Sequence, residues 1–233
     1  MRTLGLETHE DYLRFVVGDE SAVELVHLLD SISTNVTSFY REAVHFEILA
    51  DLIREWSIHS QPRFRIWCAA SSTGEEPYTL AMSVLEALGG PHPDFRLLAT
   101  DISTRVLEAA REGVYSAAKV EPVPRPLLQK YFRKLGGGPD ADYQVNDELK
   151  RIVSFNRLNL SEPPFPMKGP FDVVFCRNVM IYFDNEVRRR LVLEISRLLK
   201  PGGYLMIGHS ESLSGIVSPL TLVQPAVYRK AAT

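Results

Sequence analysis

The chain has 233 residues, of which 45% are hydrophobic and 24% charged, and its formal net charge is −3 at pH 7. These values favour one large α/β domain, or one domain with a small appendage, around a substantial core. They exclude the basic excess typical of nucleic-acid-binding proteins. Apolar runs approaching the roughly 20 residues that cross a bilayer, and a signal-peptide core, are also absent. We therefore expect neither a nucleic acid partner nor membrane insertion.

The first part of the chain is predicted to be helical. Apolar residues recur at helical spacing over residues 8–30. A second helix is expected to follow the polar residues 33–35, which are good N-caps, and to run through residue 53. We assign residues 1–55 to a helical N-terminal segment that includes a linker helix.

Strand and helix patterns alternate over residues 56–233, the predicted main domain. The expected strands cover residues 64–70, 95–101, 151–159, 171–178, 204–208 and 220–228. The expected helices cover residues 78–88, 104–111 and 185–199, and Ser103 and Asp184 are predicted to cap the last two. This alternation indicates a doubly wound, mostly parallel sheet. The last two strands are joined by a loop too short for a crossover helix, so we expect them to pair antiparallel.

Residues 115–150 break the alternation. They contain a proline-rich stretch, a short amphipathic helix near residues 127–132, a Gly-Gly-Gly turn and a brief strand at residues 143–145. Connections of this length tend to be functional. We predict an inserted subdomain at the carboxyl edge of the sheet; an ornamental loop is the alternative.

The two cysteines, Cys68 and Cys176, each lie within an apolar run that is predicted to be a central strand. We expect both to be buried thiols rather than a disulfide. The six histidines are scattered, and no His/Cys spacing matches a metal site. The sequence therefore predicts a cytoplasmic protein without a metal.

The loop at residues 71–77 is the most informative part of the chain. It follows an apolar strand, turns at Gly74 and meets Glu75 and Glu76 before a helix begins. Nucleotide-like ligands bind at this edge of open α/β sheets. A pyrophosphate loop would carry three glycines and little acid. Two glutamates instead favour a cationic nucleoside, with Glu76 pairing to a ligand ammonium. The alternative is that Glu76 only complements the helix dipole.

Other strands end in polar groups at the same edge. Asp101 closes the second strand, where an acidic side chain commonly binds the two ribose hydroxyls of a nucleoside. A turn or capping role is the alternative for Asp101. Asn159 and Leu160 follow another strand and are placed to contact an adenine ring.

Arg177 and Asn178 directly follow a strand that is apolar apart from Asp172, and Tyr182 lies four residues beyond Asn178. A charge, an amide and a phenol are therefore expected at the mouth of the crevice toward which Gly74 and Asp101 also point. A structural salt bridge would explain Arg177 alone, but not the three polar groups together.

Five ordered motifs resemble the CheR family of chemotaxis receptor methyltransferases. They are Asn-Val-Thr-Ser-Phe-Tyr-Arg-Glu at 35–42, Ser-Thr-Gly-Glu-Glu-Pro-Tyr at 72–78, Ala-Thr-Asp-Ile-Ser-Thr at 99–104, Cys-Arg-Asn-Val-Met-Ile-Tyr-Phe at 176–183 and Gly-His-Ser-Glu at 208–211. The resemblance runs from about residue 32 to residue 228. It implies a class I, Rossmann-like methyltransferase fold and transfer of a methyl group from S-adenosylmethionine to receptor glutamates.

The resemblance also implies roles for individual residues. Those implied to contact S-adenosylmethionine are Asn35, Thr37, Arg41, Gly74, Glu76, Asp101, Asn159, Leu160, Arg177 and Asn178. Arg41 and Tyr182 are implied to flank the transferring methyl group. The implied partner is the cytoplasmic helices of a chemoreceptor, bound by a monomer. In some members the insertion also binds a peptide at the receptor's C-terminus. Here its candidate strands are short, and this tether is left open.

The chain departs from the family pattern at its start. Only about 30 residues precede the Asn-x-Thr motif, so we expect the family's helical N-terminal domain to be shortened. This affects receptor recognition more than catalysis. A non-catalytic module that binds S-adenosylmethionine or a receptor is the main alternative. A nicotinamide-dependent oxidoreductase is disfavoured because Gly-x-Gly-x-x-Gly is absent.

Overall fold

A computed structural model of the chain describes residues 6, 8–18, 24, 28, 36–92, 94–138 and 140–232. Its first element is helix α1 (His9–Gly18), within the region predicted to be helical. Most of residues 19–30, and the predicted capping residues 33–35, lie outside the described residues. Within the described part, no helix has both the length and the apolar character that crossing a bilayer requires.

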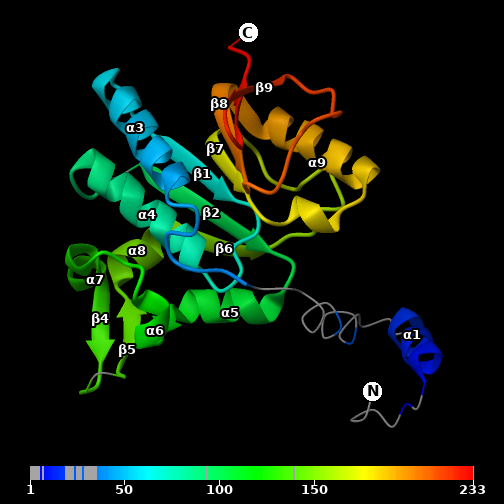
Figure 1. Cartoon of the computed structure of the whole chain (residues 1–233), viewed down its shortest axis with the longest axis horizontal. Coiled ribbons are helices and arrows are strands. Elements are labelled where there is room, and N and C mark those ends of the chain that lie inside the picture. Colours follow the sequence, from blue (N-terminus) through cyan, green and yellow to red (C-terminus); the bar gives the residue numbers. More distant parts are fainter. Residues whose placement is uncertain are drawn as a thin grey trace.

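The described residues form a seven-stranded central sheet (Figure 1). Its spatial order is β6 (Val153–Arg157), β2 (Phe95–Asp101), β1 (Phe64–Cys68), β7 (Phe171–Cys176), β8 (Leu199–Ile207), β10 (Val227–Lys230) and β9 (Leu220–Gln224). The strands from β6 to β8 pair in parallel, and β10 is antiparallel to both of its neighbours. The predicted mostly parallel α/β sheet with an antiparallel end is confirmed.

The prediction of one strand over residues 220–228 is wrong. The chain forms a hairpin instead, in which β9 pairs only with β10 and β10 pairs with β8. Pro225 has no N–H to donate to a sheet ladder, and Ala226 adopts a left-handed φ of 60°. Both features turn the chain where the apolar pattern alone continues.

Four helices accompany the parallel strands: α3 (Val44–Ile58), α4 (Glu75–Leu88), α5 (Thr104–Glu112) and α9 (Asn185–Leu198). Two of the predicted caps are confirmed. The side-chain oxygen of Ser103 accepts from the N–H of Val106 at 3.3 Å, and that of Asp184 accepts from the N–H of Val187 at 2.8 Å. Residue 55, the predicted end of the N-terminal segment, falls inside α3.

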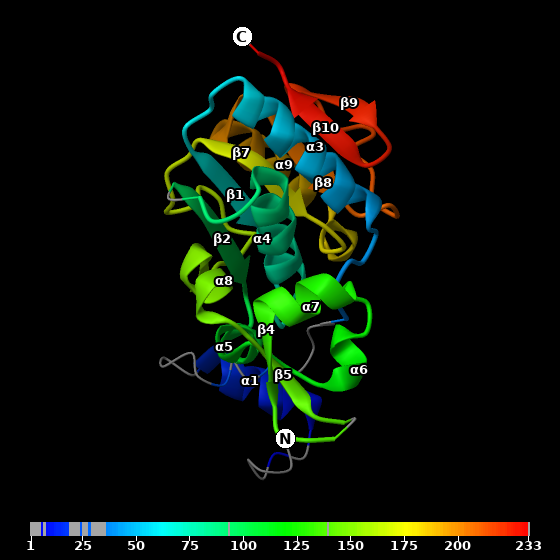
Figure 2. The same cartoon turned by 90° about the vertical axis from the view of Figure 1, so that its left-hand side faces the viewer.

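The alternation of side chains along each strand builds two hydrophobic clusters, one on each face of the sheet. On β1, Ile66 and Cys68 contribute to the cluster that contains α3 and α4, whereas Trp67 contributes to the cluster that contains α9. Figure 2 shows α3 and α4 in front of the strands and α9 behind them. The indole N–H of Trp67 donates to the hydroxyl of Thr100 on β2 at 2.9 Å. Coverage of both faces explains the continuous apolar runs in the sequence.

Helix α3 begins later than predicted. The capping pattern at residues 33–35 indicated a helix directly after them, but residues 39–43 form turns and α3 starts at Val44. Tyr40 and Glu42 have left-handed φ values of 56° and 55°, which a right-handed helix does not accommodate. The turns leave Arg41 and Glu42 beside the carboxyl ends of the strands instead of on a helix face.

The expected insertion is a small α/β unit beside α5 (Figures 1 and 2). Its elements are β3 (Val114–Tyr115), α6 (Ala117–Val120), α7 (Arg125–Tyr131), β4 (Phe132–Leu135), β5 (Asp142–Val145) and α8 (Asp147–Ile152). The strands form an antiparallel sheet in the order β3-β5-β4. Only α7 and β5 were predicted from the sequence. Helix α8 runs through Ile152, so β6 starts two residues later than predicted.

Candidate active site

A cavity of about 480 Å³ opens at the carboxyl ends of β1, β2, β6 and β7. β1 and β7 are neighbours in the sheet. The chain continues from β1 to β2 toward one edge of the sheet and from β7 to β8 toward the opposite edge, so the cavity lies at the topological switch point. Its lining residues are Val36, Thr37, Arg41, Ala69, Ala70, Ser72, Glu76, Asp101, Ile102, Leu158, Asn159, Leu160, Arg177, Asn178, Val179, Tyr182 and Phe183. The structure thus brings together most of the predicted site residues from five separate segments.

Gly74 does not line this cavity. It stands at the start of α4 with φ = 98°, where its N–H donates to the carbonyl of Ser71. A Cβ atom on Gly74 would lie 2.7 Å from the hydroxyl of Tyr115 and 3.0 Å from the Cβ of Ala110. The residue therefore allows the loop to approach α5 and the insertion closely, and Glu76, in the first turn of α4, lies in the cavity wall.

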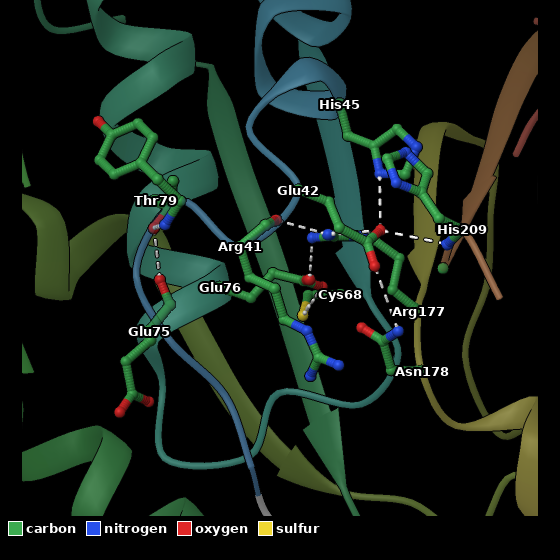
Figure 3. A network of polar contacts seen from close by, with 12 residues as sticks. Arg41, Glu42, His45, Cys68, Glu75, Glu76, Thr79, Arg177, Asn178 and His209 are labelled. Atoms are coloured by element: carbon green, nitrogen blue, oxygen red, sulfur yellow. Dashed lines mark hydrogen bonds and ion pairs between the residues drawn. The ribbon is translucent and has the colours of Figure 1, made fainter. Parts of the chain in front are cut away.

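Glu76 is buried, with 9% of its surface exposed, and its carboxylate is shared between two groups. Nη1 of Arg177 donates to Oε2 at 2.5 Å, and Sγ of Cys68 lies 3.2 Å from Oε1 (Figure 3). Burial raises the pKa of Glu76, and the positive charge of Arg177 opposes that rise. A second cation in the cavity would further favour the ionised carboxylate.

Arg177 connects the cavity to Glu42, for which the sequence predicted no role. Nη2 of Arg177 donates to Oε2 of Glu42 at 3.0 Å and to the carbonyl oxygen of Arg41 at 2.5 Å. Burial disfavours the guanidinium charge, but Glu76 and Glu42 outweigh it and raise the pKa of Arg177. For Glu42, burial is outweighed by Arg177, so its pKa is lowered. Nε of Arg177 is buried without a partner among the described residues.

Asp101 lies at the cavity edge at the end of β2. Its carboxylate accepts the N–H of Ser72 at 2.8 Å and the N–H of Ser103 at 3.1 Å. Asn159 follows β6, the strand paired with β2, and its side-chain oxygen accepts from the N–H and hydroxyl of Ser161. Both predicted nucleoside contacts therefore have side chains fixed by local hydrogen bonds. Leu160 supplies an apolar wall beside Asn159.

The N-terminal side of the cavity consists of Val36, Thr37 and Arg41, and Tyr182 closes it from the segment after β7. Nη1 of Arg41 donates to the carbonyl of Val36 at 2.8 Å, and the guanidinium lies apart from the Glu42–Arg177 network in Figure 3. Tyr182 is 59% exposed, so the residue is accessible to a large ligand. Asn35, the remaining predicted contact, lies outside the described residues.

Glu211 is a second residue for which the sequence predicted no role. Its carboxylate accepts three backbone N–H groups, those of Gly208, Asn178 and Met180, at 2.7–2.9 Å. Asn178 has a left-handed φ of 56°, and a Cβ atom on Gly208 would lie in contact with its amide. Glu211 thus ties the segment that carries Arg177 to the end of β8. Glu42 and Glu211 are the last residues of the motifs at 35–42 and 208–211, and this position could have identified them as site residues.

His45 and His209 lie beside Glu42, although their sequence spacing suggested no cluster. One ligand atom of each of the three side chains lies within 4.8 Å of the others. The ring of His45 is buried, its two nitrogens have no hydrogen bond among the described residues, and burial lowers its pKa to about 4. Arg177 donates to the same Glu42 oxygen that faces His45. The carboxylate that a metal ion would need is therefore already neutralised.

The two cysteines are buried and free, as predicted. Burial raises the pKa of both thiols. Cys68 contributes to the site through its contact with Glu76. Neither thiol is therefore poised as a nucleophile.

The donor set of the cavity fits S-adenosylmethionine. A buried carboxylate (Glu76) suits an ammonium, a strand-end carboxylate (Asp101) suits a ribose diol, and the amide of Asn159 beside Leu160 suits an adenine edge and face. The unpartnered Nε of Arg177 is a donor available to a ligand carboxylate or to water. The volume lies within the range of about 300–1,000 Å³ found for small-molecule sites.

Comparison with known proteins agrees with a site for S-adenosylmethionine. The family described as "CheR methyltransferase, SAM binding domain" matches residues 35–228. The chain is 39% identical to the chemotaxis protein methyltransferase of Salmonella typhimurium over 228 residues, 98% of this chain and 78% of that protein. It is 40% identical to the chemotaxis protein methyltransferase of Borreliella burgdorferi over 237 residues, 99% of this chain and 82% of that protein.

Among solved structures, the chain is similar to the DszA carbon methyltransferase. The match covers 83% of this chain and 37% of that one, with 16% sequence identity and a TM-score of 0.46. The sequence relatives, at about 40% identity over nearly the whole chain, are much closer.

Proposed function

This chain belongs to the family of CheR methyltransferases, and we propose that it methylates glutamate side chains in the cytoplasmic domains of chemoreceptors. Methylation in chemotaxis with S-adenosylmethionine as the donor is the activity of this family. The proposal adds the chemical identity of the acceptor. The observation that carries it is the composition of the cavity, which holds carboxylates and guanidiniums in place of a Cys–His or Ser–His pair.

A glutamate acceptor suits this composition. Its carboxyl has an unperturbed pKa of about 4.3, so it is already ionised at neutral pH and needs no general base. When bound, S-adenosylmethionine supplies an electrophilic methyl group on a sulfonium sulfur. Attack by the carboxylate neutralises two charges, so a site that replaces water favours the reaction, and alignment is worth several kcal/mol more. Serine or lysine acceptors would instead require a base to remove a proton.

We assign the following roles to the cavity residues. Glu76 binds the ammonium of the cofactor, Asp101 the ribose, and Asn159 with Leu160 the adenine. Thr37 and Arg41 cover the cofactor from the N-terminal side, where Asn35 would join them. Arg177 and Asn178 line the boundary between cofactor and substrate. Their positions around one cavity support these assignments.

Arg41 and Tyr182 are proposed to act on the acceptor. The guanidinium of Arg41 would attract the substrate carboxylate, and the hydroxyl of Tyr182, an exposed residue, would orient it by a hydrogen bond. Both groups stabilise an anion in place without removing a proton from it. They therefore suit a carboxylate nucleophile.

The test is transfer of labelled methyl from S-adenosylmethionine to a chemoreceptor cytoplasmic domain. We expect label on the receptor domain that is released by mild base, as a methyl ester is. A receptor domain with its acceptor glutamates replaced by alanine is the matched control and should stay unlabelled. Base-stable label would identify a different acceptor chemistry. Binding of S-adenosylhomocysteine without transfer would favour a non-catalytic module.

The insertion supports a further partner, a peptide from the receptor's C-terminus. Strand β4 lies at the edge of the β3-β5-β4 sheet, and its outer edge is unpaired among the described residues. An extended peptide could add to such an edge through main-chain hydrogen bonds. Replacement of Lys134 by proline should then weaken peptide binding in calorimetry while leaving S-adenosylhomocysteine binding intact. Equal peptide affinity in the variant would exclude β4 as the docking edge.

A further inference from the structure

Glu42 lies behind the cavity lining and is held by several polar contacts. Its carboxylate faces Nη2 of Arg177 at 3.0 Å, the side-chain amide of Asn178 at 3.5 Å and the backbone N–H of His209 at 3.3 Å (Figure 3). The side chain is only 18% exposed. These contacts hold Glu42 in a left-handed backbone conformation, with φ = 55°, that a residue with a side chain adopts at a cost.

The two carboxylates on Arg177 use different nitrogens. Glu76 binds Nη1, whereas Glu42 binds Nη2 together with the carbonyl of Arg41. Glu76 lines the cavity and Glu42 does not. A ligand cation can therefore draw on Glu76 while Arg177 keeps a full negative partner on its other side.

The sum of the charges around the cavity also shows that Glu42 suits a cationic ligand. The charged residues that line the cavity are two acids, Glu76 and Asp101, and two bases, Arg41 and Arg177, so the lining is neutral. Glu42, directly behind Arg177, makes the set negative by one charge. The ring of His45 beside Glu42 adds no charge at neutral pH, because its pKa is about 4. S-adenosylmethionine has an ammonium, a sulfonium and a carboxylate, and so carries one positive charge.

We propose that Glu42 is a positioning residue that neutralises Arg177 from behind and thereby leaves Glu76 free to bind the ammonium of the cofactor. This inference rests on the proposed role of Glu76. Without Glu42, the buried guanidinium would have Glu76 as its only carboxylate among the described residues. The ammonium would then compete with Arg177 for one carboxylate and would face an uncompensated positive charge.

The experiment compares two ligands that differ in the amino-acid part. S-adenosylhomocysteine carries the ammonium, whereas 5′-methylthioadenosine keeps the nucleoside and sulfur but lacks the amino acid. Dissociation constants are measured by calorimetry for the wild-type chain and for Glu42→Gln, which preserves shape but removes the charge. We expect about a tenfold weaker affinity for S-adenosylhomocysteine and less than about a twofold change for 5′-methylthioadenosine. Glu47→Gln, on the exposed face of α3, is the matched control and should change neither.

Other results of this experiment would contradict the proposed role of Glu42. Equal losses for both ligands in Glu42→Gln would mean that Glu42 only holds the fold of the site, and no loss for either would mean that Arg177 needs no second partner. Both overturn the proposal. If Glu42→Gln fails to fold, Glu42→Asp, whose carboxylate is one methylene shorter, should still lower affinity selectively for S-adenosylhomocysteine; an unselective loss overturns it. A wild-type chain that binds neither ligand would instead refute the proposed function.

Discussion

Charged side chains around the cavity shift one another's pKa values. Burial raises the pKa of Glu76, and the charge of Arg177 opposes that rise; Glu76 and Glu42 in turn raise the pKa of Arg177 against the effect of its burial. A buried ion pair of this kind contributes little net stability, because desolvation offsets attraction. Its use is to hold the carboxylate of Glu76 where a ligand cation arrives. The same logic makes removal of either partner more disruptive than the pair is stabilising.

Arg41 gives the first prediction at this scale. Its guanidinium lines the cavity but stands apart from the Glu42–Arg177 network, so its loss should affect the substrate more than the cofactor. Arg41→Ala should lower kcat by about tenfold or more, with only a modest loss of S-adenosylhomocysteine affinity. Steady-state methyl transfer and calorimetry provide the two values. Arg54→Ala, an exposed position on α3, is the control. Unchanged turnover in Arg41→Ala would show that Arg41 does not act on the substrate.

His45 gives a prediction about pH. Burial, and then the charges of Arg177 and His209, lower its pKa from 6.5 to about 4, while Glu42 opposes them. Between these values the unfolded chain binds a proton that the folded chain does not, so stability falls as pH decreases from 6.5 to 4. The slope for one proton is at most about 1.4 kcal/mol per pH unit.

Urea unfolding of His45→Gln at several pH values tests this. The variant should lose part of the pH dependence between pH 6.5 and 4, whatever its stability at pH 7. His59→Gln, at an exposed position, should retain the wild-type slope. An identical slope in His45→Gln and wild type would show that His45 titrates normally in the folded chain.

At the scale of elements, loops at the carboxyl ends of the strands determine the site, and each is fixed by contacts across the chain. The 71–77 loop packs on Tyr115, whose hydroxyl donates to the carbonyl of Thr73 at 2.7 Å. In the same place, Nζ of Lys119 on α6 reaches Glu75 at 2.8 Å. The insertion is therefore connected to the cofactor loop through partly buried contacts, and its position influences how α4 begins.

Gly74 tests this connection. Gly74→Ala adds a Cβ atom 2.7 Å from the Tyr115 hydroxyl at a backbone φ of 98°, so both contact and conformation oppose it. We expect a loss of more than about 2 kcal/mol in the free energy of unfolding, measured in urea. Gly136→Ala has a similar φ of 82° but open space around it, and should cost about 1 kcal/mol. Equal losses would show that packing against Tyr115 contributes nothing.

At the scale of the whole molecule, the cavity joins segments that lie far apart in the sequence. Its walls come from residues near 37, 72, 101, 159 and 178, and α3 and α9 support it from opposite faces of the sheet. A ligand that binds these segments together stabilises only the folded chain. Its effect should therefore appear in global unfolding.

We expect S-adenosylhomocysteine at 100 times its dissociation constant to stabilise the chain by about 2.7 kcal/mol. For a chain of this size that corresponds to a rise in Tm of about 5–10 °C. Differential scanning calorimetry measures the shift, and NAD at the same concentration is the control. A comparable shift with NAD would favour a nicotinamide-dependent enzyme and contradict the assignment of the cavity.

The prediction of the fold from sequence succeeded where the signal was local. Ser103 and Asp184 cap their helices because capping depends on residues two or three positions away. Continuous apolar runs at β1 and β7 predicted buried parallel strands. The approach failed where tertiary contacts or turns override the pattern, as at the late start of α3, the hairpin around Ala226 and the additional strands of the insertion.

Sequence and structure thus decided different things about this protein. The sequence alone determined the α/β class, the family resemblance and the residue types gathered at one sheet edge, because strand ends and motif spacing are local properties. Only the tertiary structure assigned partners. Arg177 reaches Glu42 across 135 positions and Glu76 across 101, and no periodicity links residues so far apart. The acidic loop supplies a carboxylate, but the fold decides that an arginine, itself neutralised by Glu42, lies beside it.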